Sequence, residues 1–117
     1  MSELKIELCG KITAALAERI AADLEASDAS CPVTLIIDAD ADDDEVGQKI
    51  IEAIEILRSR GVSVTGKVTG KARWAAFTIL QRCRPRVAYR DAALGWGIWA
   101  LNAERAREMG FLDEICL

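Results

Sequence analysis

The sequence predicts an α/β domain with a largely parallel sheet. Segments with strand-like and helix-like hydrophobic patterns alternate from one end of the chain to the other, an order that places helices against parallel strands. The 117 residues suit one domain, and a hydrophobic share of 51% is enough for one core. No linker or low-complexity tract interrupts the chain, so we expect a single domain over residues 1–117.

The first two segments are a strand and an amphipathic helix. Leu4, Ile6 and Leu8 alternate with charged residues, which predicts a half-buried strand over 3–9. Thr13 occupies the position of a helix N-cap, and apolar residues then recur at every fourth position. This spacing predicts a helix over 14–26.

The next segments repeat the same order. After a turn-rich connector over 27–32, the nearly continuous apolar run 33–37 is typical of a central strand. An acidic loop over 38–45 follows. Apolar residues at helical spacing over 46–57 predict a second helix, which Gly61 is expected to end.

The remaining chain continues the alternation in shorter pieces. The expected elements are a strand over 62–68, an apolar helix over 72–81, a strand over 86–89, a helix over 103–109 and an extended piece over 111–116. Asn102 is the expected N-cap of the last helix, and Gly110 is its expected end.

The residue types that are present and absent exclude several kinds of chemistry. The chain contains no histidine, so Ser-His and Cys-His catalysis and histidine-bound metals are excluded within it. Its cysteines, Cys9, Cys31, Cys83 and Cys116, form no C-x-x-C pair, and we expect reduced thiols packed as apolar residues. We expect no metal and no other cofactor. We also expect a cytoplasmic protein without membrane contact, because no apolar run approaches the roughly 20 residues of a membrane span and the N-terminus lacks a signal-peptide pattern.

Charge is distributed unevenly along the chain. Residues 61–90 hold seven basic and no acidic side chains, whereas residues 1–60 hold six basic and fourteen acidic ones. A solvated surface is the simplest interpretation, and docking of oppositely charged surfaces between copies of the chain is the second. Binding of nucleic acid ranks third, because the isoelectric point near 4.9 opposes it.

The acidic loop is a candidate site for a cation or for a basic partner surface. Its aspartates are Asp38, Asp40, Asp42, Asp43 and Asp44. An EF-hand is excluded, because Asp43 stands where that loop needs glycine and Lys49 where it needs glutamate. Stabilisation of the following helix start by negative charge is the preferred interpretation. Opportunistic binding of a cation, or docking of a basic surface from a neighbouring copy, remains open.

Four stretches of the chain form a recognisable pattern when taken together: the first strand with its Gly-x-Ile ending at 4–12, the strand at 32–38, the strand–turn–helix at 62–77 and the closing pattern at 102–115. In this order they resemble the Clp protease proteolytic subunit, ClpP, within the wider ClpP/crotonase superfamily. The closing pattern, from Asn102 to Ile115, is the most specific. The resemblance implies a ClpP/crotonase-like fold, in a minimal version without the family's handle segment.

The resemblance also implies that the catalytic positions are degenerate. The family's serine nucleophile falls at Trp74, its histidine falls near Gly97, and its glycine loop falls at 40–42. A peptidase needs an activated nucleophile beside a base, so we expect no catalytic residue at these positions. The leading hypothesis is a catalytically inactive ClpP-like protein that acts through self-association or partner binding. The alternative is a small superfamily enzyme with crotonase-type acyl-thioester chemistry or a cryptic peptidase activity.

Partner-binding or interface residues are expected where aromatic and basic side chains gather. The candidates are Trp74, Trp96, Trp99, Lys71, Arg73, Arg82, Arg84 and Arg86. Filling of a disused cleft, or packing in an interface, is preferred for the tryptophans over a recognition surface. Family members form rings or trimers, and we expect a homo-oligomer here, with a protein partner possible and nucleic acid not expected.

Overall fold

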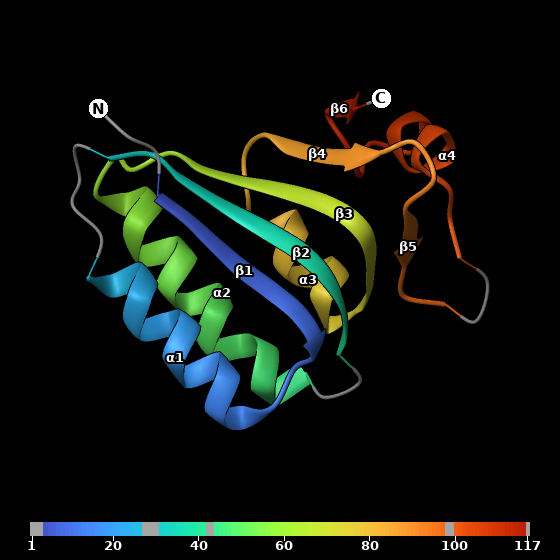
Figure 1. Ribbon diagram of the computed structural model, residues 1–117. Helices are drawn as coiled ribbons and strands as arrows, with labels where there is room; N and C mark the ends of the chain where they lie inside the picture. Colours follow the sequence, from blue (N-terminus) through green and yellow to red (C-terminus); the bar gives the residue numbers. More distant parts are fainter. Residues whose placement is uncertain (1–3, 27–30, 42–43, 98–99, 117) are drawn as a thin grey trace.

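The computed structural model describes residues 4–26, 31–41, 44–97 and 100–116. In these ranges the chain forms β1 (Leu4–Lys11), α1 (Ala14–Glu25), β2 (Val33–Ala41), α2 (Asp44–Ser59), β3 (Val64–Trp74), α3 (Ala75–Gln81), β4 (Arg86–Tyr89), β5 (Ala93–Gly95), α4 (Ala103–Glu108) and β6 (Glu114–Cys116) (Figure 1). The sheet order is β1-β2-β3-β4-β6, and β5 also pairs with β3. All of these pairings are parallel, which confirms the predicted fold class.

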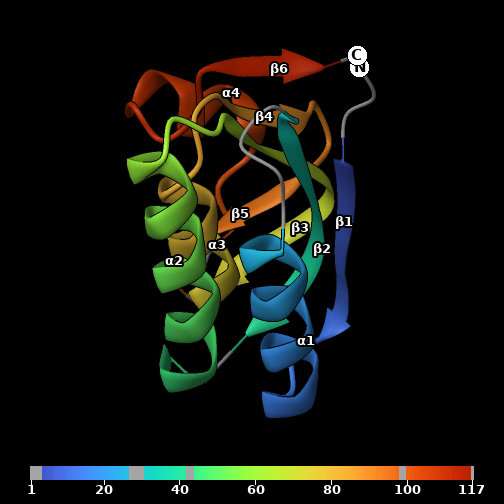
Figure 2. The same ribbon diagram turned by 90° about the vertical axis from the view of Figure 1, so that its left-hand side faces the viewer.

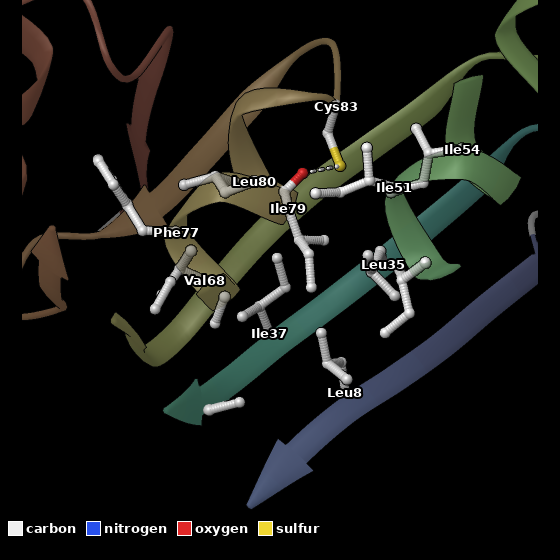
Figure 3. Packing of buried hydrophobic residues seen from close by; sticks show 14 of the residues in the cluster. Leu8, Leu35, Ile37, Ile51, Ile54, Val68, Phe77, Ile79, Leu80 and Cys83 are labelled. Carbon is white, nitrogen blue, oxygen red and sulfur yellow. Dashed lines mark hydrogen bonds between the residues drawn. The ribbon is translucent and has the colours of Figure 1, made fainter. Parts of the chain in front are cut away.

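The helices α1, α2 and α3 cover one face of β1, β2 and β3 (Figures 1 and 2). Inward side chains of the strands, such as Leu8, Ile37 and Val68, are fully buried and pack against apolar residues of α2 and α3 (Figure 3). Outward residues of β1, such as Lys5 and Glu7, are exposed. The predicted half-buried character of the first strand is therefore confirmed.

Local capping signals placed the starts of α1 and α4 correctly. The Thr13 hydroxyl accepts a hydrogen bond from the Leu16 N–H at 3.2 Å, and the Asn102 side chain accepts one from the Arg105 N–H at 2.8 Å. Both residues are the predicted N-caps. No helix in the described ranges is long and apolar enough to cross a membrane.

The largest boundary differences from the prediction arise because β2 and β3 continue pairing beyond their apolar runs. β2 extends to Ala41, so Asp38 and Asp40 lie in a strand and not in an acidic loop. β3 extends to Trp74, which moves the start of α3 from the predicted residue 72 to Ala75. The added pairs include Asp40 with Arg73 and Ala41 with Trp74. Hydrogen bonds between neighbouring strands determine these ends, and periodicity does not report them.

Strand β5 was not predicted. It has three residues, and a segment this short carries no readable hydrophobic alternation. It forms because Ala93, Leu94 and Gly95 pair with the last part of β3, from Lys71 to Arg73. This pairing brings the segment after β4 beside the carboxyl end of β3.

Gly66 allows α3 to approach β3 closely. A Cβ at this position would lie 2.7 Å from Leu80 Cδ1 and 2.9 Å from Cys83 Cβ. We expect Gly66→Ala to lower the free energy of unfolding by about 1–3 kcal/mol, because the added methyl group overpacks this contact. Urea denaturation measures the loss. Thr65→Ala is the matched control, since residue 65 points to the other face of β3, and equal stability of Gly66→Ala and the unmodified protein would contradict the prediction.

Candidate functional site

The junction between β3 and α3 is a sharp elbow occupied by Trp74. Trp74 has φ 59° and ψ −125°, and it is the one non-glycine residue with positive φ in the described ranges. Such a conformation costs a bulky residue of the order of 1–3 kcal/mol and persists only where the surroundings impose it. Here Trp74 pairs with Ala41 on one side, and α3 starts directly after it with Ala75 and Ala76 buried. Strand-to-helix elbows of this kind present their central side chain to solvent. Trp74 is the central residue here, and it is 42% exposed.

A pocket of about 620 Å³ lies beside the elbow. Its lining comes from the carboxyl ends of three neighbouring strands: Gly10 and Lys11 of β1, Asp40 of β2, and Lys71, Arg73 and Trp74 of β3. In α/β sheets, ligands bind outside the carboxyl ends of the strands. The elbow pocket is therefore the candidate functional site.

Lys71 is paired with the aspartates of β2. The Lys71 Nζ lies 3.1 Å from Asp40 Oδ2, and the Lys71 N–H donates to Asp38 Oδ1 at 3.2 Å. Asp38 also lies against Gly70, where a Cβ would be 2.4 Å from Asp38 Oδ1. The sequence analysis left open that a basic surface of a neighbouring copy offsets the negative charge of these aspartates. In the structure, Lys71 of the same chain offsets part of it.

Arg73 connects the elbow to the segment after β5. Its guanidinium donates to the Leu94 carbonyl oxygen at 3.3 Å and to the Gly97 carbonyl oxygen. The same guanidinium lies over the Trp74 ring, 5.8 Å from the ring centroid. One side chain thus contacts both positions, Trp74 and Gly97, at which the family resemblance places the nucleophile and the histidine. No sequence signal indicated this role of Arg73, because the pairing of β5 with β3 brings these positions together.

The other tryptophans lie outside the elbow pocket or outside the described ranges. Trp96 packs edge-on against Phe77 and Phe111, with ring centroids 4.6 and 5.3 Å apart, and its Nε1 donates to Thr78 Oγ1 at 2.7 Å. These contacts hold the Trp96 ring in place. Trp96 is 40% exposed, so part of the ring faces solvent. Trp99 falls outside the described residues.

Arg82, Arg84 and Arg86, which lie just before β4 or at its first residue, are at the other end of the sheet. Arg82 forms an ion pair with Glu55 at 3.7 Å, and Arg84 donates to the carbonyl oxygens of Gln81 and Cys83. Arg86 starts β4 and pairs with Gly66 near the start of β3, whereas Lys71 and Arg73 lie near the end of β3. The structure therefore divides the basic segment 61–90 into two separate groups.

Arg86 is a structural residue, although the sequence suggested a surface role. Its guanidinium Nη2 lies 2.9 Å from Asp113 Oδ1, and its Nη1 donates to Gln81 Oε1 at 2.7 Å. The side chain is only 11% exposed. Hydrogen bonds from Arg86 lower the pKa of Asp113 to about 2.

The other acidic candidates of the predicted loop cannot be placed in the site. Asp42, Asp43 and the Asp44 side chain lie outside the described parts of the structure. Among the residues that are described, no group of three or more Asp, Glu, Cys or His side chains could hold a metal ion.

Neither Cys9 nor Cys83 is an activated nucleophile. Burial raises the pKa of the Cys83 thiol to about 12, and that side chain is fully enclosed. Desolvation, followed by the charges of Glu7 and Asp38, raises the pKa of Cys9. A reactive cysteine needs a lowered pKa, so neither thiol qualifies. The prediction of packed thiols holds for Cys83 but is wrong for Cys9, because the alternation of β1 places Cys9 on the exposed face.

No family model and no curated protein matches the chain. Solved structures, in contrast, do match the chain. ClpP1 from Listeria monocytogenes has 16% sequence identity and a TM-score of 0.85, covering 96% of this chain and 90% of that chain. A point mutant of the same ClpP1 has 16% identity, a TM-score of 0.82 and the same coverage. A structure described only as an enzyme has 16% identity and a TM-score of 0.82, covering 97% of this chain and 94% of that chain. The chain therefore has a ClpP-like fold.

Proposed function

We propose that this ClpP-like chain binds a protein partner at the elbow pocket and does not hydrolyse peptide bonds. The observation that carries the proposal is the residue at the elbow: Trp74 holds the exposed, strained position with an indole that cannot attack a carbonyl. The chain has no histidine to serve as a base. The described residues that line the pocket include no serine, threonine or cysteine.

The lining residues indicate the chemistry of the partner. Three cations, Lys11, Lys71 and Arg73, face the pocket with one carboxylate, that of Asp40. The exposed Trp74 ring provides a large apolar surface, and tryptophan and arginine are enriched where binding energy concentrates. This combination suits an acidic peptide segment that carries an apolar or aromatic side chain.

Catalysis and binding are tested separately. We expect neither turnover of fluorogenic peptides nor labelling by a serine-reactive fluorophosphonate, because no nucleophile stands at the elbow. Turnover or labelling at a level well above a heat-denatured sample would reject the proposal. Clear thermal stabilisation by acyl-coenzyme A compounds would favour crotonase-type chemistry instead.

Binding is tested with synthetic acidic peptides that carry one aromatic residue. We expect binding to weaken at least about tenfold, equivalent to 1.4 kcal/mol, in Lys11→Ala and in Trp74→Ala, since each removes one lining contact. Isothermal titration calorimetry measures the affinities, and basic peptides of the same length provide the ligand control. Arg105→Ala removes an exposed cation of α4 outside the pocket and is the matched protein control. Equal affinity for acidic and basic peptides would count against this site.

A further inference from the structure

The outer edge of β1 carries no paired strand among the residues that the structure describes. β1 pairs with β2 from Leu4 to Lys11, and in the described parts of the chain no other strand pairs with it. Figure 1 shows β1 at the margin of the sheet. An edge of this length presents a row of backbone donors and acceptors that can pair with another strand.

The backbone groups on this edge can be assigned to alternate residues. The Leu4 N–H donates to the Pro32 carbonyl oxygen at 3.0 Å, so the backbone of Leu4 faces β2. Because N–H and C=O directions alternate along a strand, those of Lys5, Glu7 and Cys9 face the open edge. All three residues are exposed.

The pattern of charges on β1 suits a second copy of the same strand. In an antiparallel pair, only registers that place edge-facing residues opposite edge-facing residues can form hydrogen bonds. A two-fold axis at Ile6 meets this condition. It places Lys5 opposite Glu7 of the second copy on both sides of the axis, and Leu4 opposite Leu8.

Most neighbouring registers place like charges opposite each other. An axis at Lys5 opposes two lysines, an axis at Glu7 opposes two glutamates, and an axis at Leu8 opposes Lys5 with Lys11. An axis at Cys9 avoids like charges, but it loses the pairing of Leu4 with Leu8. Complementary charge and apolar pairing therefore coincide at Ile6.

Space beside the edge allows a second strand to approach. A hollow of about 710 Å³ runs along β1 and is lined by β1 residues, by Ile36 of β2 and by residues of α1. The α1 lining includes Arg19 and Asp23, which lie one helical turn apart with opposite signs. A two-fold axis reverses this order as well, so the two helices present complementary charges to each other.

We propose that two copies of this chain associate by antiparallel pairing of their β1 strands about a two-fold axis at Ile6, which joins the two sheets into one. The interface is isologous, and it differs from docking of the acidic segment 1–60 of one copy on the basic segment 61–90 of another. The paired residues 4–8 do not line the elbow pocket, to which β1 contributes Gly10 and Lys11, so either proposal can fail while the other stands.

Charge reversal tests the association. Sedimentation equilibrium of the full chain should show a monomer–dimer equilibrium that shifts toward monomer at high salt. We expect Glu7→Lys and Lys5→Glu each to raise the dimer dissociation constant at least about tenfold, because each creates like-charge pairs. The double variant Lys5→Glu/Glu7→Lys restores opposite charges and should restore dimerisation. A protein that stays monomeric, or single reversals without effect, would overturn the proposal, as would a double variant no better than the singles.

Cross-linking tests the register. In a background in which Cys9, Cys31 and Cys116 are replaced by serine, a short thiol cross-linker should join Lys5→Cys to Glu7→Cys when the two variants are mixed. Either variant alone should give little product, because identical positions do not oppose each other in this register. Spontaneous dimer formation through Cys9 in the unmodified protein would instead place the axis at Cys9 and reject the Ile6 register. Circular dichroism of each variant verifies that the fold is retained.

Discussion

Phe77→Ala is expected to lower the free energy of unfolding by about 3–5 kcal/mol, the largest loss among the substitutions considered. Phe77 is fully buried in α3, directly behind the elbow. Its ring packs edge-on against Trp96 at 4.6 Å and against Phe111 at 5.5 Å. Alanine would leave a cavity that these rings cannot fill without leaving their own contacts.

Guanidinium denaturation followed by circular dichroism measures this loss. Trp96→Ala is the matched control within the same aromatic cluster. It should cost less, because the residue is already 40% exposed and its indole gives up less buried surface. A Phe77→Ala variant that loses less than about 1 kcal/mol would show that the cluster does not stabilise the elbow.

Asp113→Ala is expected to cost about 2 kcal/mol at neutral pH. Asp113 accepts hydrogen bonds from the Arg86 N–H at 2.7 Å, from Arg86 Nε at 3.1 Å and from Arg86 Nη2 at 2.9 Å. Removing the carboxylate leaves a guanidinium that is 11% exposed with Gln81 as its remaining side-chain partner. A fully buried pair costs about 3–5 kcal/mol when broken, and the expected loss is smaller because the Asp113 side chain is 36% exposed and solvent screens the pair.

The effect of Asp113 should depend on pH. The pKa of Asp113 is lowered from 3.8 to about 2 in the folded protein. A carboxyl with a lowered folded pKa stabilises the protein above its unfolded pKa and loses this contribution as pH falls through its folded pKa. The stability difference between the unmodified protein and Asp113→Asn should therefore be full above pH 4 and shrink between pH 4 and pH 2.

Urea denaturation at several pH values measures this dependence. The Arg90–Glu104 ion pair is a suitable comparison, because its side chains are 60% and 61% exposed. Glu104→Ala should change stability little, as expected for a solvated ion pair. A difference for Asp113→Asn that stays constant down to pH 2 would contradict the assignment of the lowered pKa to this carboxyl.

Several features of the fold were readable because they depend on neighbours in the chain. Alternation identified β1, four-residue spacing identified α1 and α2, and capping side chains located the starts of α1 and α4 at Thr13 and Asn102. A parallel α/β sheet followed from the order of these elements. Each of these signals acts over one or two turns of helix or a few residues of strand.

Candidate site residues could be named from the sequence, but their grouping could not. Lys71, Arg73 and Trp74 do line one pocket, whereas Arg82, Arg84 and Arg86 lie near the amino end of β4. Lys11 and Gly10 were missed because their place in the pocket depends on the parallel register of β1 with β2. No local pattern reports which strand ends meet.

The sequence by itself determined the fold class, the half-buried character of the first strand and the N-caps at Thr13 and Asn102. These follow from residue type and from spacing within single elements. Only the tertiary structure decided that β3 ends in a strained elbow at Trp74, that Arg73 reaches the segment after β5, and that Arg86 is held by Asp113. The physical reason is that these features are contacts between residues far apart in the chain, whose geometry depends on the pairing of whole strands.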